Sequence, residues 1–367
     1  MDFIKMSKKS SDGSTSTRGS TSTTTTTTTT STPLHIAVLT GGYSGEADVS
    51  RRSAAVVMEH VDRTRFVPYL VHIDPDSWWV EHPETSERTP VDKETLAYKH
   101  TGNTTVQADL AFVMVHGTPG EDGQLQAHLD LCGIPHTTAS ARVMATTFHK
   151  GWTTALLRDA GISVARSVEC LPSDRWDETR QKEVLESLGL PCFVKPSESG
   201  SSLGITRVTQ RAQLWPAVLE ARKTGTSTVL IEARLKGREF TCGIIPDGLG
   251  GIQVLPITEI VSDNDFFDYA AKYDGQSHEI TPAQLDPRDT SALQDQAVMV
   301  YQTLHVKGMA RVDMMMENGG EPHVMEINTV PGFSTESIIP QQANVAGIDK
   351  ANLISRLIDE ALRRQAK

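Results

Sequence analysis

The chain has 367 residues, with 35 Lys and Arg against 46 Asp and Glu, so its net charge is −11. An acidic chain without a basic stripe argues against nucleic acid as the main partner. The four cysteines are scattered, which predicts buried, reduced thiols. No apolar run reaches the roughly 18 residues of a membrane span. We therefore expect a cytoplasmic protein of two or three domains without a membrane partner.

Residues 1–33 are expected to form a disordered tail without a catalytic role. Ser20 to Thr32 contains only Ser and Thr. Such a run buries too little apolar surface to offset its ordering entropy. The folded part should begin near Leu34.

The folded part opens with a strand, a helix and a second strand. Apolar residues at 34–39 lead into the glycine turn 40–46, a helical pattern covers 49–61, and a strand covers 66–73. This order is Rossmann-like. The turn has the spacing G-G-x-x-G rather than G-x-G-x-x-G, which argues against a nicotinamide site.

A further strand at 110–115 ends in the turn 116–123, which contains three glycines. Ligands bind at the carboxyl ends of strands in open α/β sheets. His116 is therefore interpreted as part of a substrate pocket, with a structural loop histidine as the alternative.

The middle of the chain carries one lysine within a helical stretch and a second lysine at the end of a strand. Residues 138–160 read as helical and include Lys150, and the strand 190–196 ends in Lys195. The Gly/Ser loop 197–204 follows, and Ile205 begins a return strand. Such a loop can fold its amides over phosphates as a mobile lid does.

The strand 228–235 is apolar and then turns polar. It can offer backbone groups to an adenine edge, and Glu239 could reach a ribose hydroxyl. Taken alone, Glu232 and Glu239 would be ordinary surface acids.

Residues 261–282 have weak periodicity and include an aromatic-rich run, although the chain is only 5% aromatic. They predict an ordered active-site loop. Amphipathic helices are predicted at 288–304 and 350–364.

Two strands joined by Asn318-Gly-Gly predict a β-hairpin. If the hairpin is symmetric about its glycines, Asp313 lies opposite Glu326, and Arg311 lies opposite Asn328. All four side chains then share one face, because residues two apart in a strand do. The other face would hold Val312, Met314, Met325 and Ile327.

Two carboxylates and an amide oxygen in such a cluster suit Mg²⁺. The alternative is a solvated strand face. The loop 329–337 decides between them: it opens a helix and places N–H groups and hydroxyls beside the carboxylates, which suits anions. The combination predicts a centre that handles phosphate.

With these segments assembled, the sequence resembles the D-alanine-D-alanine ligase family of the ATP-grasp group. The resemblance covers residues 35–367, and five ordered motifs carry it. These motifs are GGYSGEADVS at 41–50, HGTPGEDG at 116–123, VKPSESGSSLG at 194–204, FDYAAKY at 267–273 and EINTVPGFSTES at 326–337.

The resemblance implies an α/β fold with α+β elements, a three-domain ATP-grasp ligase. After the tail at 1–33, an N-terminal Rossmann-like domain would span 34–138. A central ATP-grasp subdomain would span 139–236, and a C-terminal catalytic domain 237–367. It further implies a cytoplasmic homodimer that condenses two D-alanines, cleaving ATP to ADP and phosphate through an acyl phosphate, for peptidoglycan synthesis.

The resemblance also implies roles for individual residues. Arg311 and the Gly332 amide would stabilise the developing oxyanion, and a cluster of Glu46, Ser201 and Tyr273 would close the loop. Glu46 would bind the ammonium of the first D-alanine, and His116 joins it in the substrate pocket. Ser337 and Lys272 would hold the carboxylate of the second D-alanine. Two Mg²⁺ or Mn²⁺ ions would be bound by Asp313, Glu326 and Asn328. ATP would be bound by Lys150, Lys195, Ser202, Glu232, Leu235, Glu239 and Lys272.

Two positions depart from the family's pattern: Phe267 stands where many members carry Tyr, and GEADVS at 45–50 replaces the frequent AEREVS. Neither departure removes a proposed ligand. The alternatives are a ligase of D-alanine with D-lactate and an ATP-binding regulator without turnover. Retention of Tyr273 favours D-alanine over D-lactate as the second substrate, and retention of Arg311 argues against the regulator.

Overall fold

The structure is a computed structural model that describes residues 32–81, 86–100, 104–200, 203–262 and 277–365. The chain divides into two units, Met1–Thr32 and Pro33–Lys367, and the second contains all of the helices and strands described below. Within the described ranges, no helix is both long and apolar enough to cross a membrane.

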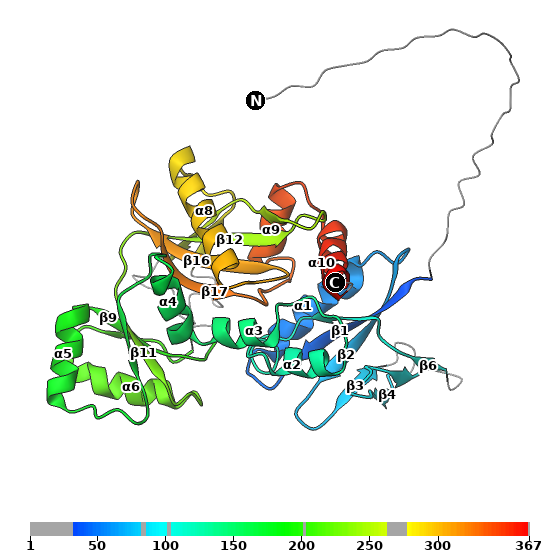
Figure 1. Ribbon diagram of the computed structural model, residues 1–367, viewed down its shortest axis with the longest axis horizontal. Coiled ribbons are helices and arrows are strands. Elements are labelled where there is room, and N and C mark those ends of the chain that lie inside the picture. Colours follow the sequence, from blue (N-terminus) through cyan, green and yellow to red (C-terminus); the bar gives the residue numbers. More distant parts are fainter. Residues whose placement is uncertain (1–31, 82–85, 101–103, 201–202, 263–276, 366–367) are drawn as a thin grey trace, which may run out of the picture. The chain divides into compact units, whose positions relative to one another are not determined.

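The first sheet confirms the Rossmann-like start (Figure 1). Its strand β1 pairs in parallel with β2 on one side and β7 on the other. Residues Ile36–Leu39 are completely buried, as expected for a parallel strand covered on both faces. The strands in spatial order are β4 (Arg88–Pro90), β3 (Trp78–Glu81), β2 (Phe66–Ile73), β1 (Leu34–Gly41) and β7 (Leu110–Val113). The other elements of this part are α1 (Ala47–His60), α2 (Gln124–Leu131) and the small hairpin β5 (Tyr98–Lys99) with β6 (Thr105–Val106).

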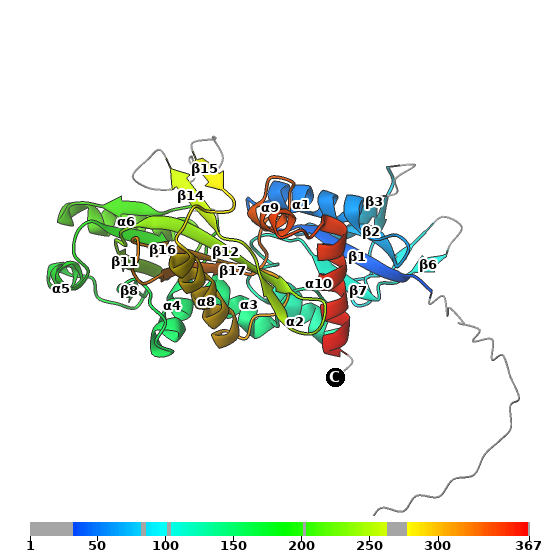
Figure 2. The same cartoon turned by 90° about the horizontal axis from the view of Figure 1, so that it is seen from above.

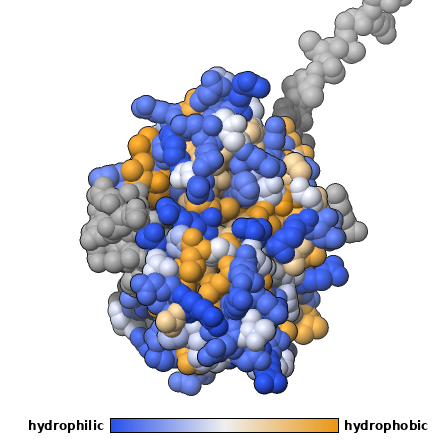
Figure 3. All heavy atoms as spheres, turned by 90° about the vertical axis from the view of Figure 1, so that its left-hand side faces the viewer, coloured by the Kyte–Doolittle hydropathy of each residue, from blue (hydrophilic) through white to orange (hydrophobic). Residues whose placement is uncertain are grey.

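The second sheet is antiparallel, and helices cover one of its faces. Figure 1 shows α5 and α6 beside β9 and β11, and their apolar residues form one core with the sheet. The opposite side of α5 is rich in Arg, Lys and Glu, in keeping with the many hydrophilic side chains on the face drawn in Figure 3. The strand order is β10 (Thr206–Val208), β9 (Cys192–Pro196), β11 (Val229–Ala233) and β8 (Ser167–Cys170). The helices are α5 (Glu178–Leu188), α6 (Leu214–Arg222) and the 3₁₀ turn η2 (Arg211–Gln213).

The predicted single helix at 138–160 is wrong in one respect. The structure has two helices, α3 (Ala141–Phe148) and α4 (Lys150–Asp159), separated by His149. His149 has extended backbone angles and makes an antiparallel bridge with Glu198. This pairing uses the backbone of His149 for a loop contact instead of a continuous helix.

The third sheet has the order β15-β14-β12-β16-β17, with β13 paired to β12. Side chains alternate along β12 and β16, so that Phe240, Cys242, Val312 and Met314 are fully buried on one face. The strands are β12 (Arg238–Pro246), β13 (Ile252–Val254), β14 (Thr258–Ser262), β15 (Ser277–Ile280), β16 (Ala310–Met316) and β17 (His323–Asn328). The helices are α8 (Pro287–Thr303), α9 (Ile338–Val345) and α10 (Lys350–Gln365), so both predicted C-terminal helices are confirmed.

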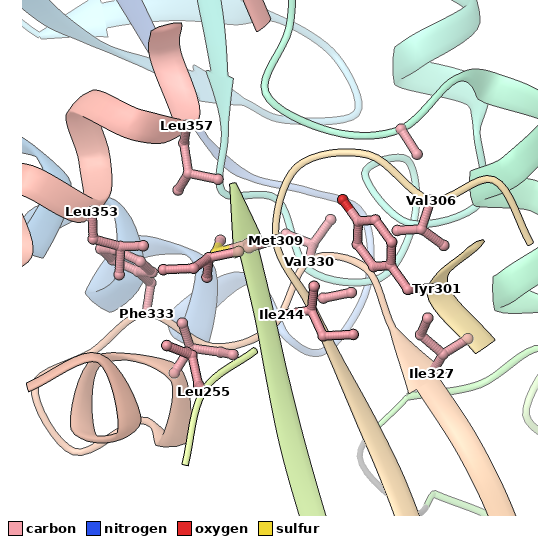
Figure 4. Packing of buried hydrophobic residues seen from close by; sticks show 14 of the residues in the cluster. Ile244, Leu255, Tyr301, Val306, Met309, Ile327, Val330, Phe333, Leu353 and Leu357 are labelled. Atoms are coloured by element: carbon pink, nitrogen blue, oxygen red, sulfur yellow. The ribbon is translucent and has the colours of Figure 1, made fainter. Parts of the chain in front are cut away.

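The buried face of the third sheet belongs to a core shared with α8, α10 and the first sheet. Figure 4 shows Ile244 of β12 and Tyr301 of α8 packed in this core, with Leu353 of α10. Figure 2 shows α10 running past the sheet toward α1, and the two helices are in contact. The buried face of the third sheet is thereby packed together with elements from the N-terminal part of the chain.

Gln342 of α9 ties that helix to the third sheet. Its side chain is fully buried, accepts from Gly243 N at 3.0 Å, and donates to Thr241 O and Thr258 Oγ1, each at 3.0 Å. Every one of these partners is itself a buried polar group, so the amide satisfies several groups at once.

We predict that Gln342→Ala lowers the free energy of unfolding by about 1–3 kcal/mol, because it leaves the Gly243 N–H and the Thr241 carbonyl without this partner. Urea denaturation measures the change. The neighbouring Gln341→Ala is the control, since Gln341 is half-buried and should change stability by less than about 0.5 kcal/mol. Equal losses in the two variants would contradict the role of the buried amide.

Candidate active site

The register of β16 and β17 confirms the pairing predicted from the sequence. Arg311 lies opposite Asn328, and Asp313 lies opposite Glu326. Thr241 of β12 lies opposite Asp313 on the other side. These side chains therefore share the polar face of the third sheet, because directly opposed residues point to the same side.

The predicted position of Met325 in the hairpin is wrong. A β-bulge between Asp313 and Met314 shifts the register, so Met314 pairs with Val324. Val324 is buried and Met325 is half-exposed, although the sequence predicted Met325 on the core face. The bulge inserts one extra residue into β17, which reverses the alternation beyond Glu326.

Arg311 and Asp313 form a two-point ion pair at the centre of this face. Arg311 Nε and Nη2 each donate to one oxygen of Asp313 at 2.8 Å, and Thr241 Oγ1 donates to Asp313 Oδ1 at 2.6 Å. Burial disfavours the charge of Arg311, but the carboxylate of Asp313 outweighs it and raises the pKa of Arg311 above its ordinary value. The site thus holds a permanent cation.

The two lysines that are predicted to bind phosphate lie on α4 and on β9. Lys150 is the first residue of α4, and its Nζ donates to Ser199 O at 2.6 Å and lies 3.8 Å from Glu326 Oε2. Lys195 is the next-to-last residue of β9 and lies beside Glu232 of β11, with 2.6 Å between Nζ and Oε2. Both members of this second pair are buried. The sequence suggested separate ligand contacts for Lys195 and Glu232 but not that they pair with each other.

Two further residues predicted to bind ATP lie nearby in the sequence. Leu235 is half-exposed just after β11. Glu239 of β12 is half-exposed and lies two residues from Thr241, so it projects from the polar face that carries Asp313.

The turns after β1 and β7 meet around Gly117. Ser44 Oγ donates to His116 O at 3.1 Å. A Cβ at Gly117 would lie 3.0 Å from Glu46 Oε2, and φ at this residue is 67°, so only glycine fits this approach. A Cβ at Gly200 would also collide with the carboxylate of Glu46. Glu46 therefore lies between the first-sheet turns and the Gly/Ser loop.

His116 is fully engaged in holding other segments. Its Nε2 bonds to Ser53 Oγ at 3.0 Å, and its backbone N–H donates to Ser50 Oγ at 2.9 Å. Ser53 Oγ in turn accepts from Phe333 N at 3.0 Å. Burial lowers the pKa of His116 to about 4, so the ring is neutral near pH 7. The ring joins α1 to the 329–337 loop, a contact that the sequence did not indicate.

Gly332 and Ser337 lie together in the 329–337 loop, where a Cβ at Gly332 would be 2.9 Å from Ser337 Oγ. Ser337 is the N-cap of α9 and accepts from Ser334 N at 3.0 Å. Its position at a helix N-terminus suits a carboxylate. Four predicted residues, Ser201, Ser202, Lys272 and Tyr273, lie outside the described residues.

Glu121 is a residue that sequence reasoning left without a role. Its Oε2 accepts a hydrogen bond from Gly117 N at 3.1 Å. The carboxylates of Glu121 and Glu46 therefore both lie close to Gly117. Burial, then the negative charge of Glu46, raises the pKa of Glu121 to about 8. Its position in the turn after a parallel strand was the one available signal.

In the described part of the chain, no group of three or more His, Cys, Asp or Glu residues is placed to hold a metal ion. The predicted ligands are a mixed set of two carboxylates and one amide on adjacent strands. An all-oxygen set on one face fits Mg²⁺ in its chemistry. Glu326, with a side chain 35% exposed, opens toward solvent.

Two family models match most of the folded chain. The model described as the D-ala D-ala ligase N-terminus matches residues 35–139, and the model of the D-ala D-ala ligase C-terminus matches residues 156–359. The chain belongs to the D-alanine–D-alanine ligase family.

Relatives within this family match the chain nearly end to end. A D-alanine–D-alanine ligase of Flavobacterium johnsoniae is 39% identical over 89% of this chain and 99% of its own. One from Christiangramia forsetii is 40% identical over 90% and 99%. Among solved structures, the VanG D-Ala:D-Ser ligase of Enterococcus faecalis has a TM-score of 0.80 at 29% identity, over 90% of this chain and 100% of that one. These matches confirm the predicted ATP-grasp fold.

We predict that Glu121→Gln makes the protein more stable at about pH 8 than the wild type and nearly equal to it at about pH 5. Between the ordinary carboxyl range and the raised pKa of Glu121, about 8, the folded state binds more protons than the unfolded state. The free energy of unfolding therefore falls as pH rises through that window, and glutamine removes this effect. Urea denaturation at both pH values measures it. A variant that is less stable at the higher pH would show that Glu121 is ionised when folded.

Proposed function

We propose that the chain is an ATP-dependent ligase that joins two D-alanines into D-alanyl-D-alanine, for the synthesis of peptidoglycan precursors. One observation carries this proposal: Arg311, Asp313, Glu326 and Asn328 converge on one sheet face within a chain of this family. Lys150 beside Glu326 on that face, and Lys195 on the second sheet, would supply the charge that a triphosphate needs.

The proposed reaction has two steps. The carboxylate of the first D-alanine attacks the γ-phosphate of ATP, which releases ADP and gives an acyl phosphate. The amine of the second D-alanine then attacks the acyl carbon, and inorganic phosphate leaves with the C–O bond electrons. No protein nucleophile is required, so the protein contributes positioning and charge stabilisation.

The residues at the centre of the site have distinct parts in this chemistry. Lys150 and Lys195 bind the phosphates, while Glu232, Leu235 and Glu239 hold the adenine and ribose. Arg311, kept charged by Asp313, faces the negative charge that develops on the carbonyl oxygen, together with the Gly332 amide. Mg²⁺ ions bound by Asp313, Glu326 and Asn328 would neutralise charge on the transferred phosphoryl group.

The two D-alanine substrates bind at different parts of the site. Glu46 binds the ammonium of the first D-alanine, in the pocket that His116 organises through Ser53. Ser337 at the start of α9 holds the carboxylate of the second, with Lys272. Ser202 joins the ATP contacts, and Ser201 and Tyr273 join Glu46 in closing the loop. We also propose the domain boundaries 34–138, 139–236 and 237–367, a homodimer and a cytoplasmic location.

The assay that tests the function is ADP release by the purified full chain with D-alanine, L-alanine or D-alanine plus D-lactate. D-alanine alone should support turnover, and D-alanyl-D-alanine should be the main product near neutral pH. L-alanine should give at most about one hundredth of that rate, because a chiral pocket misplaces the reacting atoms. Mainly depsipeptide from the mixture would move the chain to the D-alanine–D-lactate alternative. ATP binding without turnover would favour the regulator.

We predict that Asp313→Asn and Glu326→Gln each lower turnover at millimolar Mg²⁺ by at least about a hundredfold, because metal charge stabilises the transferring phosphoryl group by several kcal/mol. Glu317→Gln is the matched control, since Glu317 is an exposed acid on the same hairpin. Circular dichroism checks that all three variants are folded. Near-wild-type ADP release from both ligand variants would remove the metal assignment.

A further inference from the structure

Helix α4, which begins with Lys150, has an unusual N-cap. The cap is His149, whose Nδ1 accepts from Trp152 N at 3.2 Å, whereas Ser, Thr, Asp and Asn are the usual caps. The ring of His149 also stacks on that of Trp152, with centroids 4.3 Å apart and an angle of 13°. Because Nδ1 accepts, the ring proton is on Nε2. Only 5% of His149 is exposed, so neighbouring residues surround its side chain.

A carboxylate from the second sheet meets the same turn. Glu169 of β8 places Oε1 3.8 Å from His149 Nδ1. This oxygen is buried and has no hydrogen-bond partner within the described ranges. A Cβ at Gly151 would collide with it, so the carboxylate lies directly against the first turn of α4. Negative charge at a helix N-terminus is favourable.

Glu169 connects this turn to the second phosphate-binding lysine. On one edge of β11, Leu230 pairs with Glu169, and on the other edge it pairs with Lys195. Opposed residues share a face, so Glu169 and Lys195 project from the same side of the sheet. Helix α4 begins with Lys150, and Lys195 belongs to the second sheet. The helix and the sheet are therefore in contact at His149 and Glu169.

The Gly/Ser loop that follows Lys195 is hydrogen-bonded to the start of α4. Lys150 N donates to Ser197 O at 2.8 Å, and Lys150 Nζ donates to Ser199 O at 2.6 Å. His149 makes its backbone bridge with Glu198. Three consecutive loop residues thus contact the His149–Lys150 pair, so a shift of this cap would move both the lysine and the start of the loop.

We propose that His149 and Glu169 are positioning residues that set Lys150 relative to Lys195 and so shape the site for the ATP phosphates. The inference rests on the proposed function in its choice of ATP as the ligand. His149 acts through its cap bond, and Glu169 acts by fixing the first turn of α4 against the second sheet.

The test compares His149→Ala, His149→Asn and Glu169→Gln in the full chain. His149→Ala should raise the KM for ATP by about tenfold to a hundredfold while leaving the KM for D-alanine unchanged, because misplaced groups lose binding steeply with distance. His149→Asn should recover most of this loss, since an asparagine oxygen can accept from Trp152 N. Glu169→Gln, which keeps the shape without the charge, should give a smaller increase.

Asp177→Ala is the matched control. Asp177 caps α5 in the same part of the chain and accepts from Arg180 N at 3.0 Å. Its loss should lower the melting temperature without changing the KM for ATP. If His149→Ala behaves like this control, His149 is a structural cap and the inference is wrong.

Calorimetric titration with a non-hydrolysable ATP analogue separates the inference from the proposed function. A wild type that binds the analogue but makes no D-alanyl-D-alanine overturns the function, while the affinities of the three variants still decide the inference. Equal affinities for wild type, His149→Ala and Glu169→Gln overturn the inference alone. A wild type without affinity for the analogue overturns both.

Discussion

The ion pair of Arg311 with Asp313 is the interaction around which the site is arranged. Two strands of the third sheet hold Asp313, since Thr241 of β12 donates to the same carboxylate that Arg311 grips with two bonds. A buried charge pair of this kind needs all its partners, and its hydrogen bonds supply them. Its neighbours across the hairpin, Glu326 and Asn328, then have fixed positions on the same face. Because the guanidinium of Arg311 cannot lose its proton, the face keeps one fixed positive charge among these oxygen-bearing side chains.

Other segments reach this face through buried polar contacts rather than through sequence neighbours. Ser53 forms hydrogen bonds with both His116 and Phe333 N, and so connects the turn after β7 to the 329–337 loop. Gln342 carries α9 to β12. Lys150 contacts both Ser199 O of the Gly/Ser loop and the carboxylate of Glu326, and so connects that loop to the third sheet. Each contact links parts of the chain that are far apart in sequence, so the candidate site is assembled from several turns and one sheet.

The sequence predicted the features that depend on local order. The hairpin itself and the pairs Arg311–Asn328 and Asp313–Glu326 agree with the structure. Next to the turn, however, Met314 pairs with Val324, so the turn alone does not give these pairs, and the β-bulge restores them. The bulge at Met325 could not be predicted, since it accompanies a contact of Val324 with the distant Ser163. The break at His149 likewise comes from pairing with Glu198 and has no Pro or Gly signal. The Lys195–Glu232 pair depends on how two separate strands align, which no local pattern records.

The central claim is that the carboxylate of one D-alanine is phosphorylated before the peptide bond forms. D-alanine labelled with ¹⁸O in its carboxylate tests this directly when the inorganic phosphate is examined by ³¹P NMR. We expect each phosphate released to carry one ¹⁸O atom, because the carboxylate oxygen that attacks the γ-phosphate leaves with it. Phosphate without the label, released along with D-alanyl-D-alanine, would exclude an acyl phosphate intermediate.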